Sequence, residues 1–209
     1  MTFEDATGEC GVIAILRGVT PDEVVEVARA LHQAGIRAVE VPLNSPEPFM
    51  SIQRLAEAFA GRLVCGAGTV LTPGDVDRLK SHGGTISVSP DCNPAVIARA
   101  VEQGLEPLPG VFTPTEALSA IRAGARHLKL FPAEAAGPQV IKAWRAVLPR
   151  HVKIYAVGGV TPSNMQSWID AGAAGFGIGS NIYKPGWSIL QVTQAADAFV
   201  SAWQALKRT

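Results

Sequence analysis

Residues 11–35 read GVIAILRGVTPDEVVEVARALHQAG and contain one complete strand-and-helix unit. The run Gly11–Arg17 is short and apolar, which is typical of a strand buried on both faces. Thr20-Pro21-Asp22-Glu23 then supplies a threonine N-cap, a proline at the first helical position and acids in the first turn. Helical periodicity runs from Val24 to Ala34 and ends at Gly35, a typical C-terminal glycine. The stretch therefore predicts a buried strand followed by a helix.

The same order of a short apolar strand and a helix recurs to the end of the chain. Further strands are predicted over Ala38–Pro42, Leu63–Thr69, Thr85–Ser89, Glu106–Val111, His127–Phe131, Lys153–Gly158 and Ala174–Gly179. Helices are predicted to open at Thr72-Pro73-Gly74-Asp75, Asn93-Pro94, Thr113-Pro114-Thr115-Glu116 and Thr161-Pro162-Ser163-Asn164, and to cover Pro138–Val147 and Ile189–Leu206.

Eight strands that alternate with eight helical patterns predict right-handed crossovers and a parallel sheet. An open, doubly wound sheet could hold eight strands. A closed barrel is favoured because eight is its strand number and because no Gly-x-Gly-x-x-Gly motif follows the first strand. We find no linker or low-complexity tract. We therefore expect an α/β protein made of a single (β/α)8 TIM barrel domain over residues 1–209.

The composition excludes several classes of protein. Eighteen lysines and arginines balance 18 aspartates and glutamates, so the chain lacks the basic excess of a nucleic-acid binder. Apolar residues make up 47% of the chain, which is too many for a disordered protein. The apolar runs are far shorter than the roughly 20 residues that a membrane-spanning helix needs. We expect small-molecule partners, with neither nucleic acid nor membrane among them.

The three cysteines, Cys10, Cys65 and Cys92, have no spacing typical of a disulfide framework or a zinc site. Residues 1–9 carry acids and no basic residue, unlike a signal peptide. These features predict a reducing, cytoplasmic environment and no metal.

Polar residues and glycines stand near the end of each predicted strand, where the rim of a (β/α)8 barrel carries its catalytic groups. Strand ends near loops are polar in any protein, and this explains Ser89 more readily than a lysine or glutamate inside an apolar run. The residues are Arg17, Glu40, Thr69, Ser89, Gly110, Lys129, Gly158 and Gly179.

Lys129 is the strongest single indication of chemistry, because it stands within the run His127–Phe131. Loss of water lowers the pKa of a lysine and makes its neutral amine a nucleophile toward ketones. Glu40, inside a second apolar run, suits a general acid and base. The alternatives are that Lys129 extends out of the barrel mouth, or that the two residues form a core ion pair. For Lys129, the pattern alone supports the catalytic and the structural interpretations about equally.

Gly158-Gly159-Val160 and Gly177-Ile178-Gly179-Ser180 end the last two strands, where such barrels commonly bind phosphate. The alternative is that these glycines serve tight turns. Thr69 offers a hydroxyl, and Arg17 offers a fork for a carboxylate or a phosphate. His127 shares the strand parity of Lys129, and we interpret it as a core residue rather than a catalyst.

With these residues in view, the chain resembles the class I pyruvate aldolases that act on 2-keto-3-deoxy-6-phosphogluconate and its galactonate epimer, the KDPG/KHG aldolase family. The resemblance covers about Gly11 to Ser188. The segments that carry it are Ile15-Leu16-Arg17-Gly18, Glu40-Val41-Pro42-Leu43-Asn44-Ser45-Pro46, Gly66-Ala67-Gly68-Thr69-Val70-Leu71, Ser89-Pro90, Lys129-Leu130-Phe131-Pro132-Ala133-Glu134, Val157-Gly158-Gly159-Val160-Thr161-Pro162 and Gly179-Ser180.

The resemblance implies a role for each matching position. It implies that Lys129 forms the Schiff base and that Glu40 donates and accepts protons. It implies that Arg17 and Thr69 hold the substrate, including the pyruvate carboxylate, and that Pro90 and Phe131 line the pyruvyl pocket. It assigns the phosphate to the glycine-rich ends of the last two strands, at Gly158, Gly159, Val160, Gly179 and Ser180. It further implies a homotrimer that needs no cofactor.

Two positions separate the branches of the family. The gluconate branch usually has an arginine where this chain has Asn44, and a threonine where it has Val157. Both differences favour cleavage of 2-dehydro-3-deoxy-6-phosphogalactonate to pyruvate and D-glyceraldehyde 3-phosphate, with some cross-reaction on the gluconate epimer. The alternatives are a gluconate-epimer or dual-specificity aldolase and, more distantly, a sugar-phosphate isomerase or epimerase that uses Glu40 as base, or a non-catalytic sugar-phosphate sensor.

Overall fold

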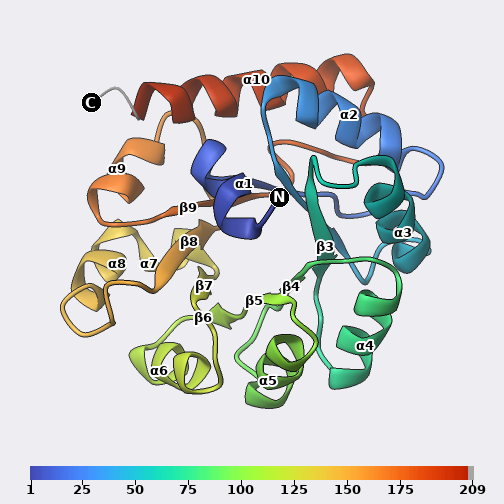
Figure 1. Ribbon diagram of the computed structural model, residues 1–209. Helices are drawn as coiled ribbons and strands as arrows, with labels where there is room; N and C mark the ends of the chain where they lie inside the picture. The colour runs from blue at the N-terminus through green and yellow to red at the C-terminus, as the bar shows by residue number, and fades with distance from the viewer. Residues whose placement is uncertain (207–209) are drawn as a thin grey trace.

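The computed structural model describes residues 1–206, whose strands form one parallel sheet with helices outside it (Figure 1). The strands are β1 (Val12–Ile15), β2 (Ala38–Pro42), β3 (Val64–Gly68), β4 (Ile86–Val88), β5 (Glu106–Leu108), β6 (Gly110–Val111), β7 (His127–Leu130), β8 (Lys153–Val157) and β9 (Gly175–Ile178). The helices are α1 (Phe3–Glu9), α2 (Val24–Ala34), α3 (Pro48–Ala58), α4 (Pro73–Ser81), α5 (Pro94–Glu102), α6 (Pro114–Arg122), α7 (Ala133–Ala136), α8 (Pro138–Trp144), α9 (Met165–Asp170) and α10 (Ile189–Leu206).

The sheet closes on itself at the strand that the sequence predicts over 106–111. Its order is β5-β4-β3-β2-β1-β9-β8-β7-β6, so β5 and β6 are its two ends. The predicted strand is divided at Pro109, because prolines cannot donate to the ladder. The Lys129 N–H donates to the Pro109 carbonyl at 2.9 Å and joins β7 to this junction. The predicted eight-unit (β/α)8 barrel is confirmed, with its fifth strand in two pieces.

The predicted threonine–proline helix starts are confirmed at Thr72 and Thr113. Each threonine side chain accepts a hydrogen bond from the backbone N–H of the acid three residues on, and that acid's carboxylate accepts one from the threonine N–H. Helix α2 instead begins at Val24, after the predicted cap at Thr20. Residues 21–23 form a turn in which Glu23 Oε1 accepts the Thr20 N–H at 3.1 Å. Helix α9 likewise begins late, at Met165.

Helices α1, α3 and α7 match none of the helices that the sequence places. Thr2 and Asp5 form a capping box that starts α1, which lies across one opening of the barrel (Figure 1). Phe3 and Ala6 of this helix belong to the inner core together with Ile13 and Tyr155. Helix α1 therefore closes the end of the barrel from which the strands begin, and leaves the other end for a site.

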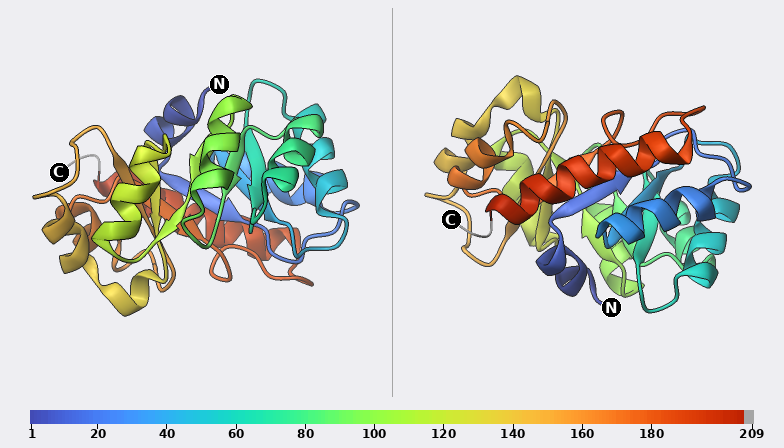
Figure 2. Two further views of the ribbon diagram at one scale, coloured as in Figure 1. Left: turned by 90° about the horizontal axis from the view of Figure 1, so that it is seen from below. Right: turned by 90° about the horizontal axis from the view of Figure 1, so that it is seen from above.

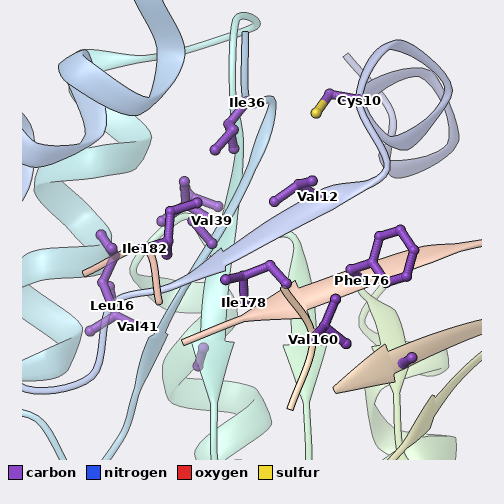
Figure 3. Close-up of a cluster of buried hydrophobic side chains, with 14 of the residues drawn as sticks. Cys10, Val12, Leu16, Ile36, Val39, Val41, Val160, Phe176, Ile178 and Ile182 are labelled. Carbon is purple, nitrogen blue, oxygen red and sulfur yellow. The ribbon is translucent and has the colours of Figure 1, made fainter. Parts of the chain in front are cut away.

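A second core fills the layer between barrel and helices. Strand residues of opposite parity, such as Val12 and Val39, belong to it (Figure 3), together with helix residues such as Leu31. Helix α10 packs along α2 on the outside of the barrel (Figure 2). No helix within residues 1–206 is long and apolar enough to cross a membrane.

Candidate active site

A cavity of about 260 Å³ opens at the carboxyl ends of the strands. Residues of five strands (β1, β2, β7, β8 and β9) and of the segments that follow β1, β3, β4, β7, β8 and β9 build its wall. The lining residues are Ile15, Arg17, Glu40, Thr69, Pro90, Lys129, Phe131, Glu134, Val157, Gly158, Gly159, Val160, Gly177, Ile178, Gly179, Ser180 and Asn181. The structure thus brings together all the predicted site residues except Asn44.

Lys129 reaches this cavity from the middle of β7. Its side chain is only 8% exposed, and its register places it between Gly110 and Tyr155 of the neighbouring strands. Within residues 1–206 no carboxylate lies within 4.0 Å of its ammonium, so the expected core ion pair is not formed. Burial lowers its pKa, and the nearby Glu40 charge opposes that shift only in part. The side chain is therefore poised to supply a neutral amine.

The Phe131 ring lies beside the lysine. The Lys129 Nζ stands 4.7 Å from the ring centroid, within the range of a cation–π contact. Phe131 follows β7 directly, and its ring is partly exposed at the cavity mouth. The ring thus offers both an apolar surface and a contact for the cationic form of the lysine.

Glu40 enters the same cavity from β2. The residue is 2% exposed, and its Oε2 atom is buried without a hydrogen-bond partner within residues 1–206. Burial raises the pKa of Glu40 to about 7, while the charges of Lys129 and Arg17 act in the opposite direction. A carboxyl group with such a pKa can both donate and accept a proton near neutral pH.

Arg17 and Asn44 form a pair at the rim of the cavity. Arg17 Nη1 donates to Asn44 Oδ1 at 2.7 Å, which joins the loop after β1 to the loop after β2. Arg17 lines the cavity, but Asn44 does not. Asn44 is therefore linked to the cavity through Arg17 and does not line it.

Thr69 has an unusual backbone conformation for a β-branched residue. Its φ is 59°, in the left-handed region, and it directly follows β3. Strained residues of this kind persist where the surrounding structure holds them, commonly at functional sites. Pro90 follows β4 and completes this side of the wall with Thr69.

The opposite wall is formed mainly by backbone. Gly159, Val160, Ser180 and Asn181 lie there, and their backbone N–H groups have no acceptor within the described chain. Asn181 Nδ2 donates to the Val160 carbonyl at 3.0 Å and links the two loops. Free amides on loops at strand ends are suited to bind an anion. This agrees with the predicted placement of a phosphate.

Two lining residues receive no individual role from the sequence. Ile15 lies within an ordinary strand pattern, whereas Gly177 and Ile178 belong to the predicted Gly177–Ser180 motif. Glu134 lies on the unexpected helix α7, and its carboxylate occupies the space that a side chain on Gly158 would need. Asn181 could have been noticed, because it directly follows the Gly179-Ser180 pair.

His127 lies one layer below the site, where the sequence places it. Its Nδ1 pairs with Glu106 Oε1 at 2.7 Å, and its ring packs edge-on against Phe3 at 4.9 Å. It does not line the cavity. His127 is therefore a core residue that ties α1 and β5 to β7.

Comparison with known proteins agrees with this site. The family model described as KDPG and KHG aldolase matches residues 4–197. The chain is 49% identical over 193 residues to 2-dehydro-3-deoxy-6-phosphogalactonate aldolase of Escherichia coli K12, covering 92% of this chain and 94% of that one. It is 32% identical to 2-dehydro-3-deoxy-phosphogluconate aldolase of Pseudomonas aeruginosa, covering 77% and 74%.

The same likeness appears among solved structures. One described as "Native KDPGal structure" superposes with a TM-score of 0.93 at 48% identity, covering 95% of this chain and 96% of that chain.

Proposed function

Because the chain belongs to the KDPG and KHG aldolase family, we propose that it is a class I aldolase that cleaves 2-dehydro-3-deoxy-6-phosphogalactonate to pyruvate and D-glyceraldehyde 3-phosphate. One observation carries the proposal: Lys129 is buried, makes no ion pair with a carboxylate in residues 1–206, and shares its cavity with Glu40. A nucleophilic amine beside a proton-transferring carboxyl group is what Schiff-base chemistry on a ketone requires.

The first step is formation of the Schiff base. The neutral Lys129 amine attacks the C2 ketone, and the carbonyl oxygen becomes the hydroxyl of a carbinolamine. Glu40 gives a proton to this hydroxyl, which leaves as water. The product is an iminium ion on Lys129. The raised pKa of Glu40 supports this role, because part of the carboxyl population carries a proton near neutral pH.

The second step breaks the C3–C4 bond. The C4 hydroxyl gives its proton to the Glu40 carboxylate, which the first step left deprotonated, and C4 becomes an aldehyde. The electrons of the C3–C4 bond move into the iminium and form an enamine. Glyceraldehyde 3-phosphate leaves. Protonation at C3, assigned to Glu40, restores the iminium, and water releases pyruvate and the free Lys129.

The remaining wall holds the substrate. We assign the pyruvate carboxylate to Arg17 and Thr69, and the pyruvyl group to the apolar surfaces of Pro90 and Phe131. We assign the phosphate to the backbone amides beside the glycines, which contribute Gly158, Gly159, Val160, Gly179 and Ser180 to the lining. A small cavity with a few fixed polar groups is suited to one orientation of such a ligand.

The galactonate epimer is the favoured substrate. The higher identity to the galactonate enzyme than to the gluconate enzyme supports this assignment. Val157 lines the cavity without a hydroxyl, and Asn44 acts through Arg17. A dual-specificity aldolase is the second candidate, because discrimination rests on few groups. Kinetics on both phosphorylated epimers decide between the two.

We also propose a cytoplasmic homotrimer. Exposed apolar side chains near the rim, Leu71 and Phe112, support association, and the free thiols of Cys65 and Cys92 support a reducing compartment. Light scattering coupled to size-exclusion chromatography measures the molar mass of the protein in solution. A monomer at micromolar concentration would contradict the trimer.

Borohydride reduction in the presence of pyruvate tests the reaction class. The expected product is one covalent adduct on the peptide that contains Lys129, located by mass spectrometry. Lys129→Met should give no adduct and no pyruvate in a coupled lactate dehydrogenase assay. Lys153→Met, at the exposed start of β8, is the matched control and should keep both the covalent adduct and the release of pyruvate. An adduct on another lysine, or none, would reject the proposed function.

A further inference from the structure

A second hollow adjoins the active-site cavity at the loop after β9. Its volume is about 410 Å³, and it shares the lining residues Arg17, Gly179 and Ser180 with the main cavity. Tyr183, Lys184 and Pro185 also line it. The two spaces therefore border the same end of the wall that carries the free amides.

The charges on the main cavity wall cancel. Arg17 and Lys129 are basic, and Glu40 and Glu134 are acidic. The proposed substrate carries a carboxylate and a phosphate, and a phosphate monoester alone bears about −1.5 to −2 at pH 7. The ligand thus brings more negative charge than this wall neutralises. Glu134, beside Gly158, adds repulsion at the phosphate end.

Lys184 is a positively charged side chain beside this wall. It lines the adjoining hollow and is exposed. Its ammonium lies 5.5 Å from the Trp187 ring centroid and forms no ion pair with a carboxylate in residues 1–206. It is therefore available to an incoming anion.

The backbone of Lys184 is held on both sides. The buried Tyr183 hydroxyl donates to Glu23 Oε1 at 2.5 Å. Pro185 packs so closely on Gly18 that a side chain there would collide with its ring. Only the flexible lysine side chain needs to be ordered when an anion binds.

We propose that Lys184 is a further phosphate-recognition residue, which reaches from the adjoining hollow to the phosphate on the Gly179-Ser180 amides. The proposal rests on the proposed function for the identity of the ligand. In this proposal Lys184 contacts only the phosphorylated end of the substrate and takes no part in the chemistry at C2.

The test compares Lys184→Gln with wild type in three measurements. The KM for the phosphorylated substrate should rise about three- to tenfold with kcat nearly unchanged. Added salt should raise the KM of the variant less steeply than the KM of wild type. Inorganic phosphate, titrated by calorimetry, should bind about three- to tenfold more weakly. Exchange of the pyruvate methyl protons in D2O, which needs Lys129 but no phosphate, should be unchanged. Lys184→Arg should restore most of the affinity.

Lys142→Gln on α8, also exposed and away from both spaces, is the control for a lost surface charge. An unchanged KM and phosphate affinity in Lys184→Gln would overturn the inference, as would an equal loss in Lys142→Gln. A parallel loss of pyruvate exchange would indicate a structural role and also overturn it. If wild type binds phosphate through Lys184 yet releases no pyruvate, the proposed function fails and the phosphate site stands.

Discussion

The Glu40 carboxylate occupies the space that a side chain on Gly68 would need. The two residues lie on the adjacent strands β2 and β3, where the register pairs Gly68 with Pro42 and Glu40 with Gly66. The missing side chain at residue 68 thus lets the carboxyl group lie inside the barrel. The position of the proton-transferring group depends on a glycine that does no chemistry.

Gly68→Ala should therefore displace Glu40. We expect kcat/KM to fall about 100-fold, because displacements of about 1 Å at an active site cost that much. Overpacking should also lower the free energy of unfolding by about 1–3 kcal/mol. Steady-state kinetics and thermal melts measure the two effects. Gly74→Ala, where the added carbon meets only the Thr72 cap at 3.8 Å, is the control. Full activity in Gly68→Ala would contradict the steric argument.

Glu40 should set the pH dependence of activity and of stability. Its folded pKa of about 7 lies above the usual glutamate pKa of 4.5, so the folded state holds more protons between these pH values. Its contribution to stability is therefore present below about pH 4.5 and is lost as pH rises through 7.

Glu40→Gln should remove this loss of stability at rising pH. Relative to wild type, the variant should gain stability between pH 5 and pH 8, by up to about 3 kcal/mol from the shift. It should also lose the kcat/KM transition near pH 7 and most activity. Melting temperatures at both pH values measure the difference. An equal effect of the substitution at pH 5 and pH 8 would show that Glu40 is not buried as a high-pKa acid.

Thr69 should separate stability from activity. Its φ of 59° is strained for a β-branched residue, so Thr69→Gly removes about 1–3 kcal/mol of strain and costs about 0.5–1 kcal/mol in chain entropy. We expect an unchanged or higher free energy of unfolding. Loss of a hydroxyl bonded to a carboxylate should lower kcat/KM about ten- to 100-fold. Thr69→Ser should keep most activity; if Thr69→Gly keeps it as well, the hydroxyl has no role in binding.

Val157 should control the preference between epimers. It is 7% exposed on the cavity wall, and Val157→Thr adds a hydroxyl there without changing the shape. We expect the ratio of kcat/KM values to move about tenfold toward the gluconate epimer, as one hydrogen bond allows. Val152→Thr places the same hydroxyl in the core away from the cavity, and should change stability but not the ratio. A constant ratio in Val157→Thr would assign selectivity elsewhere.

Asn44 should act only through Arg17. Loss of their 2.7 Å bond in Asn44→Ala should raise KM about three- to tenfold, because Arg17 is no longer oriented. Pyruvate proton exchange should slow as well, unlike in the Lys184 variant, because we place Arg17 at the carboxylate. In an Arg17→Ala background the same substitution should have little further effect. Additive losses would show that Asn44 contacts the substrate itself.

Local rules predicted much of the barrel. The alternation of apolar runs with capped helices predicted eight units, and the last helix was placed at Ile189–Leu206 as observed. The rules did not predict the division of the fifth strand at Pro109, which depends on closure against β7. They also missed α1, because its role is to cover the inner core through Phe3 rather than to continue the repeat.

The candidate site shows the same limit. The sequence identifies Lys129 and Glu40 because a charged residue inside an apolar run can be recognised without knowing the fold. It gives no role to Ile15 or Glu134, because their importance comes only from what lies opposite them in the closed barrel.

The sequence by itself determined the order of strands and helices, the lysine and the carboxyl group available for chemistry, and the loops rich in glycine. These depend on residues near one another in the chain. The tertiary structure alone decided that Lys129 and Glu40 share a cavity without an ion pair, that burial moves their pKa values toward each other, and that Asn44 holds Arg17. The physical reason is that desolvation and side-chain contact depend on distances across the barrel, which closure of the sheet sets.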